Sequence, residues 1–289
     1  MFEKVESYFR KVRVVPDDVE GMQKTHRQDS MVFFGVLVIV TWASFFFMEM
    51  LENPDLTVRN SVEAGVEYII VPSASEDNFG AVIDLCNKHN EIYGALGVHP
   101  EDVLKFNDKT AKNIFELTQK NEKIIAIGEI GLDYYWDKTN IERQKEIFKA
   151  QLEIALSLNL PVLIHDREAH NDTFEILKKA GIKKAIMHCF SGGVDFAKKC
   201  IDEGWLLGIG GVVTFKNSKK IKEVVKEIPI EKIVLETDAP YLTPHPFRGE
   251  ENSPEYLKFV IKEIAYIKDL PYETVERITT QNAKEFFNL

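Results

Sequence analysis

Four strand-like runs of this 289-residue chain each end in a residue that can bind a hard divalent metal. These residues are Glu129, His165, His188 and Asp238, at the ends of the runs IIAIGE, PVLIH, KAIMH and IVLETD. One such residue alone more often makes an ordinary hydrogen bond or caps a helix. In a parallel barrel, however, residues just past the carboxyl ends of the strands converge on one face. Two imidazoles and two carboxylates meeting there predict a hydrolytic metal centre.

Longer motifs surround these residues in a characteristic order. They are GVHPED at 97–102, AIGEIGLDYY at 126–135, NLPVLIHDRE at 159–168, MHCFSGG at 187–193, LGIGG at 207–211, LETDAPYLTP at 235–244 and RGEENSP at 248–254. In order and spacing they resemble the TatD family of metal-dependent deoxyribonucleases, from roughly Leu51 to the carboxyl terminus. The resemblance implies a TIM-type barrel that holds one or two divalent metal ions (Mg, Mn or Zn) and hydrolyses phosphodiester bonds in DNA.

The resemblance also assigns roles to single residues. Glu129 would bridge two metal ions, and His165 and His188 would bind one of them. Asp238 would bind the other ion or act as the base that orients the attacking water, so Glu129 and Asp238 are the expected catalytic residues. Asp133 is expected to accept hydrogen bonds near the site rather than to bind metal.

Three further residues are expected to contact substrate. His99 follows a strand and would touch a phosphate or cap its own loop, two alternatives that the sequence leaves open. Arg167 is a basic residue beside the expected mouth of the site. Arg248 suits bidentate recognition of phosphate, with a structural ion pair as its alternative.

The alternation of strands and helices predicts the fold. Strand-like runs are expected at 66–71, 91–98, 123–128, 160–165, 183–188, 205–210 and 232–237, with helical stretches between them. In the stretch 143–159, Ile147, Phe148, Leu152 and Ala155 fall on one helical face. We therefore expect an α/β fold, a TIM-type (β/α)8 barrel, in one domain over 31–289. Residues 1–30 carry six basic and six acidic side chains and are expected to lie outside it.

The eighth strand is where the sequence departs from the family. Members commonly carry a His-x-His pair at the end of the first strand, and here that place holds Thr41, Trp42 and Ala43. The first strand is accordingly expected to be degenerate or irregular, and the second metal ion to be held less firmly.

The uncharged segment 31–48 has three explanations. It supplies the first barrel strand, which we favour, because only seven strands are otherwise present. It is also long enough to span a membrane, a reading that is disfavoured but not excluded. The third explanation is a shifted reading frame. If Thr41 to Ser44 were encoded ACA-TGG-GCA-TCN, a shift of one nucleotide would read His-Gly-His.

Composition limits the classes of function. The net charge of −10 argues against a general nucleic-acid coat protein but not against a nuclease, because a metal cluster supplies positive charge locally. Three cysteines without paired spacing favour a reducing compartment, hence the cytoplasm. DNA is the expected partner, as substrate, and no stable protein partner is implied.

Two alternative functions remain open. One is a small-molecule hydrolase of the amidohydrolase type, although no lysine follows a hydrophobic strand as the carbamylated bridge that many of those enzymes use. The other is a catalytically weak binding protein attached to a membrane through residues 31–48.

Overall fold

The computed structural model describes residues 36–39, 54–136 and 138–289. The chain divides into two units, Met1–Phe33 and Phe34–Leu289, and all the described residues belong to the second. The strands of that unit are β1 (Val36–Ile39), β2 (Val66–Pro72), β3 (Ile92–Leu96), β4 (Ile124–Asp133), β5 (Val162–Arg167), β6 (Ala185–Met187), β7 (Leu206–Ile209) and β8 (Ile233–Leu235).

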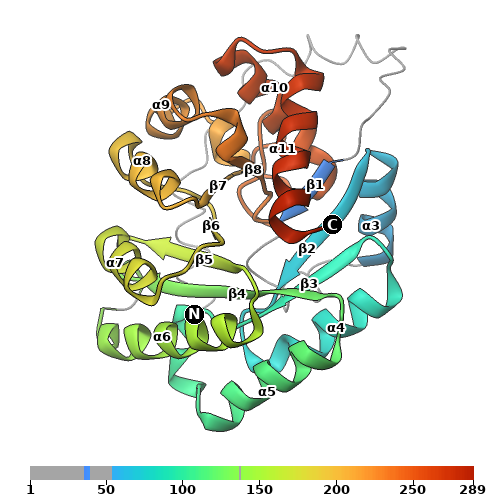
Figure 1. Cartoon of the computed structure of the whole chain (residues 1–289). Coiled ribbons are helices and arrows are strands. Elements are labelled where there is room, and N and C mark those ends of the chain that lie inside the picture. Colours follow the sequence, from blue (N-terminus) through green and yellow to red (C-terminus); the bar gives the residue numbers. More distant parts are fainter. Residues whose placement is uncertain (1–35, 40–53, 137) are drawn as a thin grey trace. The chain divides into compact units, whose positions relative to one another are not determined.

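The eight strands form one parallel sheet in sequence order, and β1 lies next to β8. The helices surround the strands (Figure 1). They are α3 (Pro54–Glu63), α4 (Phe79–Lys88), α5 (Asp108–Lys120), α6 (Ile141–Leu158), α7 (His170–Ala180), α8 (Val194–Asp202), α9 (Lys219–Glu227), α10 (Leu257–Lys268) and α11 (Tyr272–Phe287). The predicted TIM-type barrel is confirmed.

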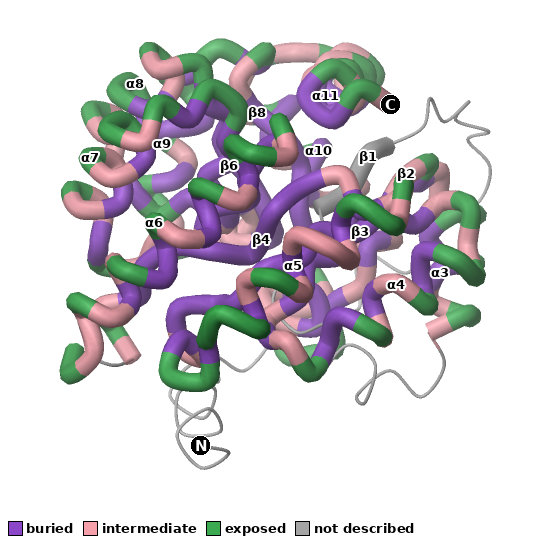
Figure 2. Tube along the Cα trace, turned by 60° about the horizontal axis from the view of Figure 1, so that its bottom comes forward, coloured by how far each residue is buried: buried purple, intermediate pink, exposed green. Residues whose placement is uncertain are grey.

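Helix α6 illustrates how the sequence encodes this arrangement. The four residues predicted for one face, Ile147, Phe148, Leu152 and Ala155, are all buried, at most 3% exposed. Burying each large side chain of this kind stabilises the fold by roughly 1.5–3 kcal/mol. The helix ends at Asn159, whose left-handed backbone (φ 53°) closes the last turn. Across the barrel, buried residues follow the strands and exposed residues follow the outer surfaces of the helices (Figure 2).

The interior of the barrel is filled by one apolar side chain from each of β2 to β8. We call this set the inner layer: Ile70, Ala95, Ala126, Leu163, Ile186, Leu206 and Val234. Phe286 and Phe287, from the end of α11, pack against it. Because side chains alternate across a strand, the residues two positions further along also point inward, toward the carboxyl face.

Residues 36–39 form the first barrel strand, as the favoured explanation of segment 31–48 requires. The pairing of β1 with β2 is parallel, and its register shifts between Val36 and Leu37, which makes the strand irregular. The remainder of 31–48, including Thr41, Trp42 and Ala43, lies outside the described residues. Among the residues that are described, no helix is long and apolar enough to span a membrane.

Strands β4 and β5 run further than the sequence predicted. They stay paired as far as Asp133 and Arg167, beyond a register shift between Ile127 and Ile130. Glu129 therefore lies in the middle of β4 and His165 two residues before the end of β5, whereas His188 and Asp238 follow strands as expected. The difference arises because two neighbouring strands that continue together keep satisfying each other's backbone groups.

Candidate metal centre

Strand alternation carries polar side chains onto the carboxyl face of the barrel. A step of two residues along a strand leads from the inner layer to this polar level. The steps run from Leu163 to His165, from Ile186 to His188 and from Val234 to Glu236. The polar side chains of the site thus project from the ends of the barrel strands, directly above the apolar inner layer.

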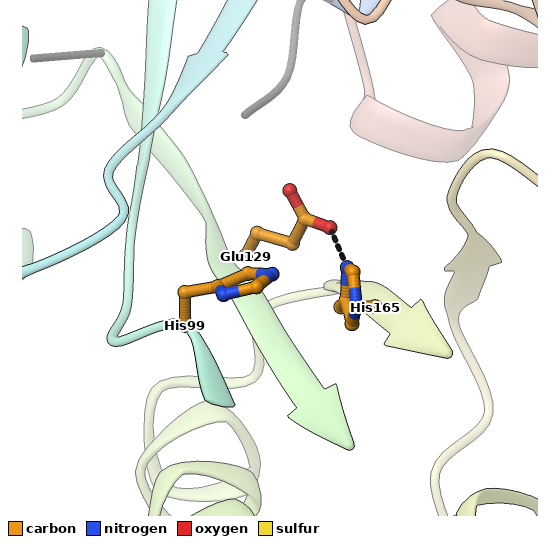
Figure 3. A group of neighbouring side chains, drawn as sticks. All are labelled: His99, Glu129 and His165. Carbon is orange, nitrogen blue, oxygen red and sulfur yellow. Dashed lines mark hydrogen bonds and ion pairs between the residues drawn. The ribbon is translucent and has the colours of Figure 1, made fainter. Parts of the chain in front are cut away.

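One group of side chains consists of His99, Glu129 and His165 (Figure 3). Their nearest ligand atoms all lie within 4.8 Å of one another. Glu129 Oε1 is 2.9 Å from His165 Nδ1, and the His99 ring meets the His165 ring edge to face, with centroids 4.2 Å apart. Glu129 is 1% exposed, and its second oxygen, Oε2, accepts no hydrogen bond from the described residues.

The imidazole of His165 is fixed from both sides. Its Nε2 lies 3.0 Å from Asp133 Oδ2, opposite the contact of Nδ1 with Glu129. The other oxygen of Asp133 accepts hydrogen bonds from the backbone N–H groups of Tyr135 (2.8 Å) and Trp136 (3.0 Å). Asp133 is therefore a hydrogen-bond acceptor that orients His165, as expected.

A second group is centred on His188. Its Nε2 lies 3.4 Å from Asp238 Oδ1, and its Nδ1 contacts Glu236 Oε2. The backbone N–H of Cys189 donates to the same Glu236 oxygen at 2.8 Å. Cys189 and Asp238 both have left-handed backbones (φ 41° and 54°), which residues other than glycine seldom adopt and which cluster at functional sites.

The charges of these groups shift one another's proton affinities. Burial alone would raise the pKa of Glu129, but the charges of His188 and His165 outweigh it and lower that pKa to about 2. Burial likewise opposes the rise for His165, yet Asp133 and Glu129 raise its pKa to about 9. The pKa of Asp238 is raised, mainly by burial, despite the His188 ring beside it.

The ring of His99 stays neutral by contrast. Burial, together with the charge of His165, lowers its pKa to about 3. His99 Nδ1 accepts a hydrogen bond from the backbone N–H of Glu101 at 3.3 Å, so this residue caps the short helix Pro100–Lys105. Capping was one of the two alternatives left open for His99, and its ring also borders the Glu129 and His165 group.

The two groups belong to one electrostatic cluster. Glu129 influences the pKa values of both His188 and Asp238, so all four sequence-predicted ligands share one face of the barrel. Imidazole nitrogens and carboxylate oxygens are donors for zinc and for harder divalent cations. The fully buried oxygen Oε2 of Glu129 accepts no hydrogen bond from the described residues. This donor set fits a divalent metal ion.

Sequence analysis missed two acidic residues of this face. Glu236 is fully buried two positions before Asp238, and its place after Val234 on the inward side of β8 was a usable signal. Glu101 follows His99 in the GVHPED motif. Burial and the neighbouring Asp133 raise its pKa to about 7, and its Oε1 is buried without a hydrogen bond from the described residues.

Both predicted substrate-binding arginines lie against aromatic rings. The Arg167 guanidinium is 4.2 Å from the ring centroid of Tyr135 and 5.2 Å from that of Trp136. The Arg248 guanidinium is 3.8 Å from the ring centroid of Phe215. Stacking restricts the motion of each guanidinium, and Arg248 Nη1 also donates a hydrogen bond to the backbone carbonyl of Thr243 at 3.1 Å.

The chain is similar to known proteins in sequence and in fold. A model of the family described as TatD related DNase matches residues 45–288. The uncharacterized metal-dependent hydrolase YabD of Bacillus subtilis (strain 168) is 44% identical over 226 residues, which cover 78% of this chain and 88% of YabD. The crystal structure of YjjV, a TatD homolog from Escherichia coli K12, superposes with a TM-score of 0.82 at 30% identity, covering 87% of this chain and 98% of that one. A TatD family hydrolase from Entamoeba histolytica shares the fold, with a TM-score of 0.77 at 22% identity.

Proposed function

Because this chain belongs to the TatD family of metal-dependent hydrolases, we propose that it hydrolyses phosphodiester bonds in DNA. The observation that carries the proposal is the carboxylate and imidazole cluster on the carboxyl face, in which Glu129 and His188 are buried and His165 and Asp238 are partly buried. Active sites of barrels of this type lie on that face. We propose these four residues as the metal ligands, with Glu129 as the bridge if two ions bind.

A divalent cation bound there supplies Lewis-acid stabilisation of phosphoryl charge and makes a water molecule easier to deprotonate. The protein's own groups do the rest. Asp238, whose Oδ1 lies 3.4 Å from His188 Nε2, accepts the proton of the attacking water. Asp133 keeps the His165 ring in one orientation. The new P–O bond forms as the bond to the leaving sugar oxygen breaks, and that oxygen takes up a proton.

Positive charge beside the cluster supports a nucleic-acid substrate. Arg167 and Arg248 are proposed to bind phosphates on either side of the cleaved bond, because a guanidinium makes paired hydrogen bonds with phosphate oxygens. The pKa of His245 is lowered mainly by burial, and the charges of Arg248 and Lys216 lower it further. His99 is proposed to border the bound phosphate.

We also propose that the protein acts in a reducing compartment, the cytoplasm. Its three cysteines are free thiols, and Cys86 and Cys200 are buried. Burial raises the pKa of each of these two to about 12, so neither offers a reactive thiolate.

A hydrolysis assay distinguishes this function from the amidohydrolase alternative. The purified chain is stripped with EDTA and then titrated with Mg²⁺, Mn²⁺ or Zn²⁺. End-labelled single-stranded and double-stranded DNA oligonucleotides are offered in parallel with a panel of small amides and esters. We expect DNA cleavage that depends on the metal. Turnover of amides or esters without cleavage of DNA would support the alternative, and absence of bound metal would favour the binding protein.

Matched variants make the assay specific. Glu129→Gln should abolish cleavage, whereas Glu276→Gln, which neutralises an equally buried carboxylate on α11, should not. Arg248→Ala should reduce the slope of log affinity for DNA against log salt concentration by roughly one, because one phosphate contact is lost. Arg277→Ala, an exposed arginine of α11, should leave that slope unchanged.

A further inference from the structure

Glu236 is a buried acid to which the proposed reaction gives no part. It is 0% exposed and lies at the polar level directly above Val234 of the inner layer. Its Oε2 receives two contacts, from Nδ1 of His188 and from the backbone N–H of Cys189. Burying a carboxylate this completely costs free energy unless hydrogen-bond donors or an opposite charge lie beside it.

Two glycines leave room for this carboxylate: Gly208 in the neighbouring strand β7 and Gly210 directly after that strand. A Cβ atom built on Gly208 would lie 2.6 Å from Glu236 Oε2, and one built on Gly210 would lie 2.9 Å from Oε1. Both distances are too short for any real side chain. The two glycines of LGIGG therefore form a cradle for Glu236, and the cradle fixes where the carboxylate can sit.

The His188 ring is oriented by this contact. With Nδ1 directed at Glu236, the opposite nitrogen, Nε2, faces Asp238 across 3.4 Å. A carboxylate behind a metal-binding imidazole holds its ring, selects the tautomer that leaves the metal-facing nitrogen unprotonated and makes that nitrogen a better donor. Glu236 has the position that this role requires.

We infer that Glu236 is a positioning residue that presents Nε2 of His188 to the metal ion from the Gly208 and Gly210 cradle. The inference rests on the proposed function, because it takes His188 as a metal ligand. It adds a residue behind that ligand and explains why glycine stands at position 208 in β7 and at position 210 just after it. Glu236 acts through His188 and does not touch substrate.

A different use of the same atoms is a buried metal site formed by His188, Cys189 and Glu236, whose ligand atoms lie within 4.8 Å of one another. Positioning is favoured because Oε2 of Glu236 already accepts the N–H of Cys189. The two uses make opposite predictions for Cys189→Ser.

The test measures zinc binding and the state of the His188 ring in the full chain. Glu236→Gln keeps the size of the side chain and removes its charge. Isothermal titration calorimetry should show zinc affinity reduced about 10–100-fold. In the zinc-loaded, histidine-labelled protein, the ring N–H proton of His188 should lose the downfield shift that a carboxylate acceptor causes. Gly208→Ala should reduce affinity similarly, and the double variant should be no weaker than the weaker single one.

Controls separate the outcomes. Cys189→Ser should leave zinc affinity and the His188 resonance unchanged, and Glu276→Gln should do the same. If Cys189→Ser loses zinc as Glu236→Gln does, the buried metal site replaces the positioning role. Equal zinc affinity and an unchanged ring resonance in Glu236→Gln would overturn the inference alone. A wild-type protein that binds no divalent metal would overturn the proposed function, and this inference with it.

Discussion

Asp133 Oδ2 lies 3.0 Å from Nε2 of His165, on the side of the ring opposite Glu129. The imidazole is thus held between two carboxylates, which favour its charged form and raise its pKa to about 9 against burial. In the metal-free protein at neutral pH the ring is protonated. A cation can bind His165 only after that proton leaves.

Metal affinity should therefore rise with pH. His165 must be deprotonated first, so affinity should increase as the pH rises toward about 9, by up to tenfold per pH unit for each proton displaced. Calorimetry in two buffers of different ionisation enthalpy measures the protons released. Affinity that is independent of pH across this range would contradict a role for His165 as ligand.

The stability of the metal-free protein should change in the opposite direction. A histidine whose pKa is raised from 6.5 to about 9 on folding stabilises the fold fully below pH 6.5. That contribution is lost as the pH rises toward about 9. Urea denaturation in EDTA at pH 6 and pH 9 measures it, with the zinc-loaded protein as the comparison.

Asp238→Asn should separate stability from activity. The pKa of Asp238 is raised by burial, so its ionised form is disfavoured in the folded state relative to the unfolded chain. Asparagine removes that cost, and the metal-free variant should melt at the same temperature as wild type or slightly higher. Hydrolysis should fall roughly 10²–10⁴-fold with the loss of the base. Asp195→Asn, on exposed α8 surface, is the control, and undiminished hydrolysis by Asp238→Asn would refute the assignment.

Restoring the missing histidines should strengthen the centre. The combined change Thr41→His, Trp42→Gly and Ala43→His places two imidazoles at the family's His-x-His position, after β1 in the sequence. Metal stoichiometry, measured by atomic emission, and DNA cleavage should rise together. A control with glutamine at positions 41 and 43 should gain neither. If the histidine variant gains neither metal nor DNA cleavage, and the wild-type protein partitions into detergent, residues 31–48 are better explained as a membrane span. Sequencing the gene tests the shifted frame.

Residues 1–30 are proposed to be dispensable for the barrel. Their balanced charge and lack of apolar periodicity give them little surface to bury. Their deletion should change the melting temperature by less than about 2 °C, the change expected for half a kcal/mol or so in a chain of this size. A larger fall, seen by calorimetry, would show that they pack on the domain.

The alternation of apolar strand-like runs with helical stretches predicted the barrel. Each strand of a parallel sheet is buried on both faces, so it is recognisable in the sequence as a continuous apolar run. They did not predict the length of β4, whose extension to Asp133 depends on pairing with β5. The family motifs directed attention to Asp238, and the acid two residues before it was passed over. The place of Glu236 two positions after Val234, on the inward side of β8, was a signal that the sequence offered. The space that Gly208 and Gly210 leave for its carboxylate could not be predicted, since the absence of a side chain carries no chemical signature in a sequence.

The proposed ligands come from four different strands, or from just beyond them, in a sheet whose strands follow one another in chain order. Each makes hydrogen bonds or ion pairs with side chains around it, and none of these contacts comes from β1. A change confined to the segment around residue 41 therefore removes only the metal ligands of that segment and leaves the other ligand positions unchanged. Such a centre would be repairable: histidine codons at positions 41 and 43 would add the ligands of the first strand to the set proposed for the other strands.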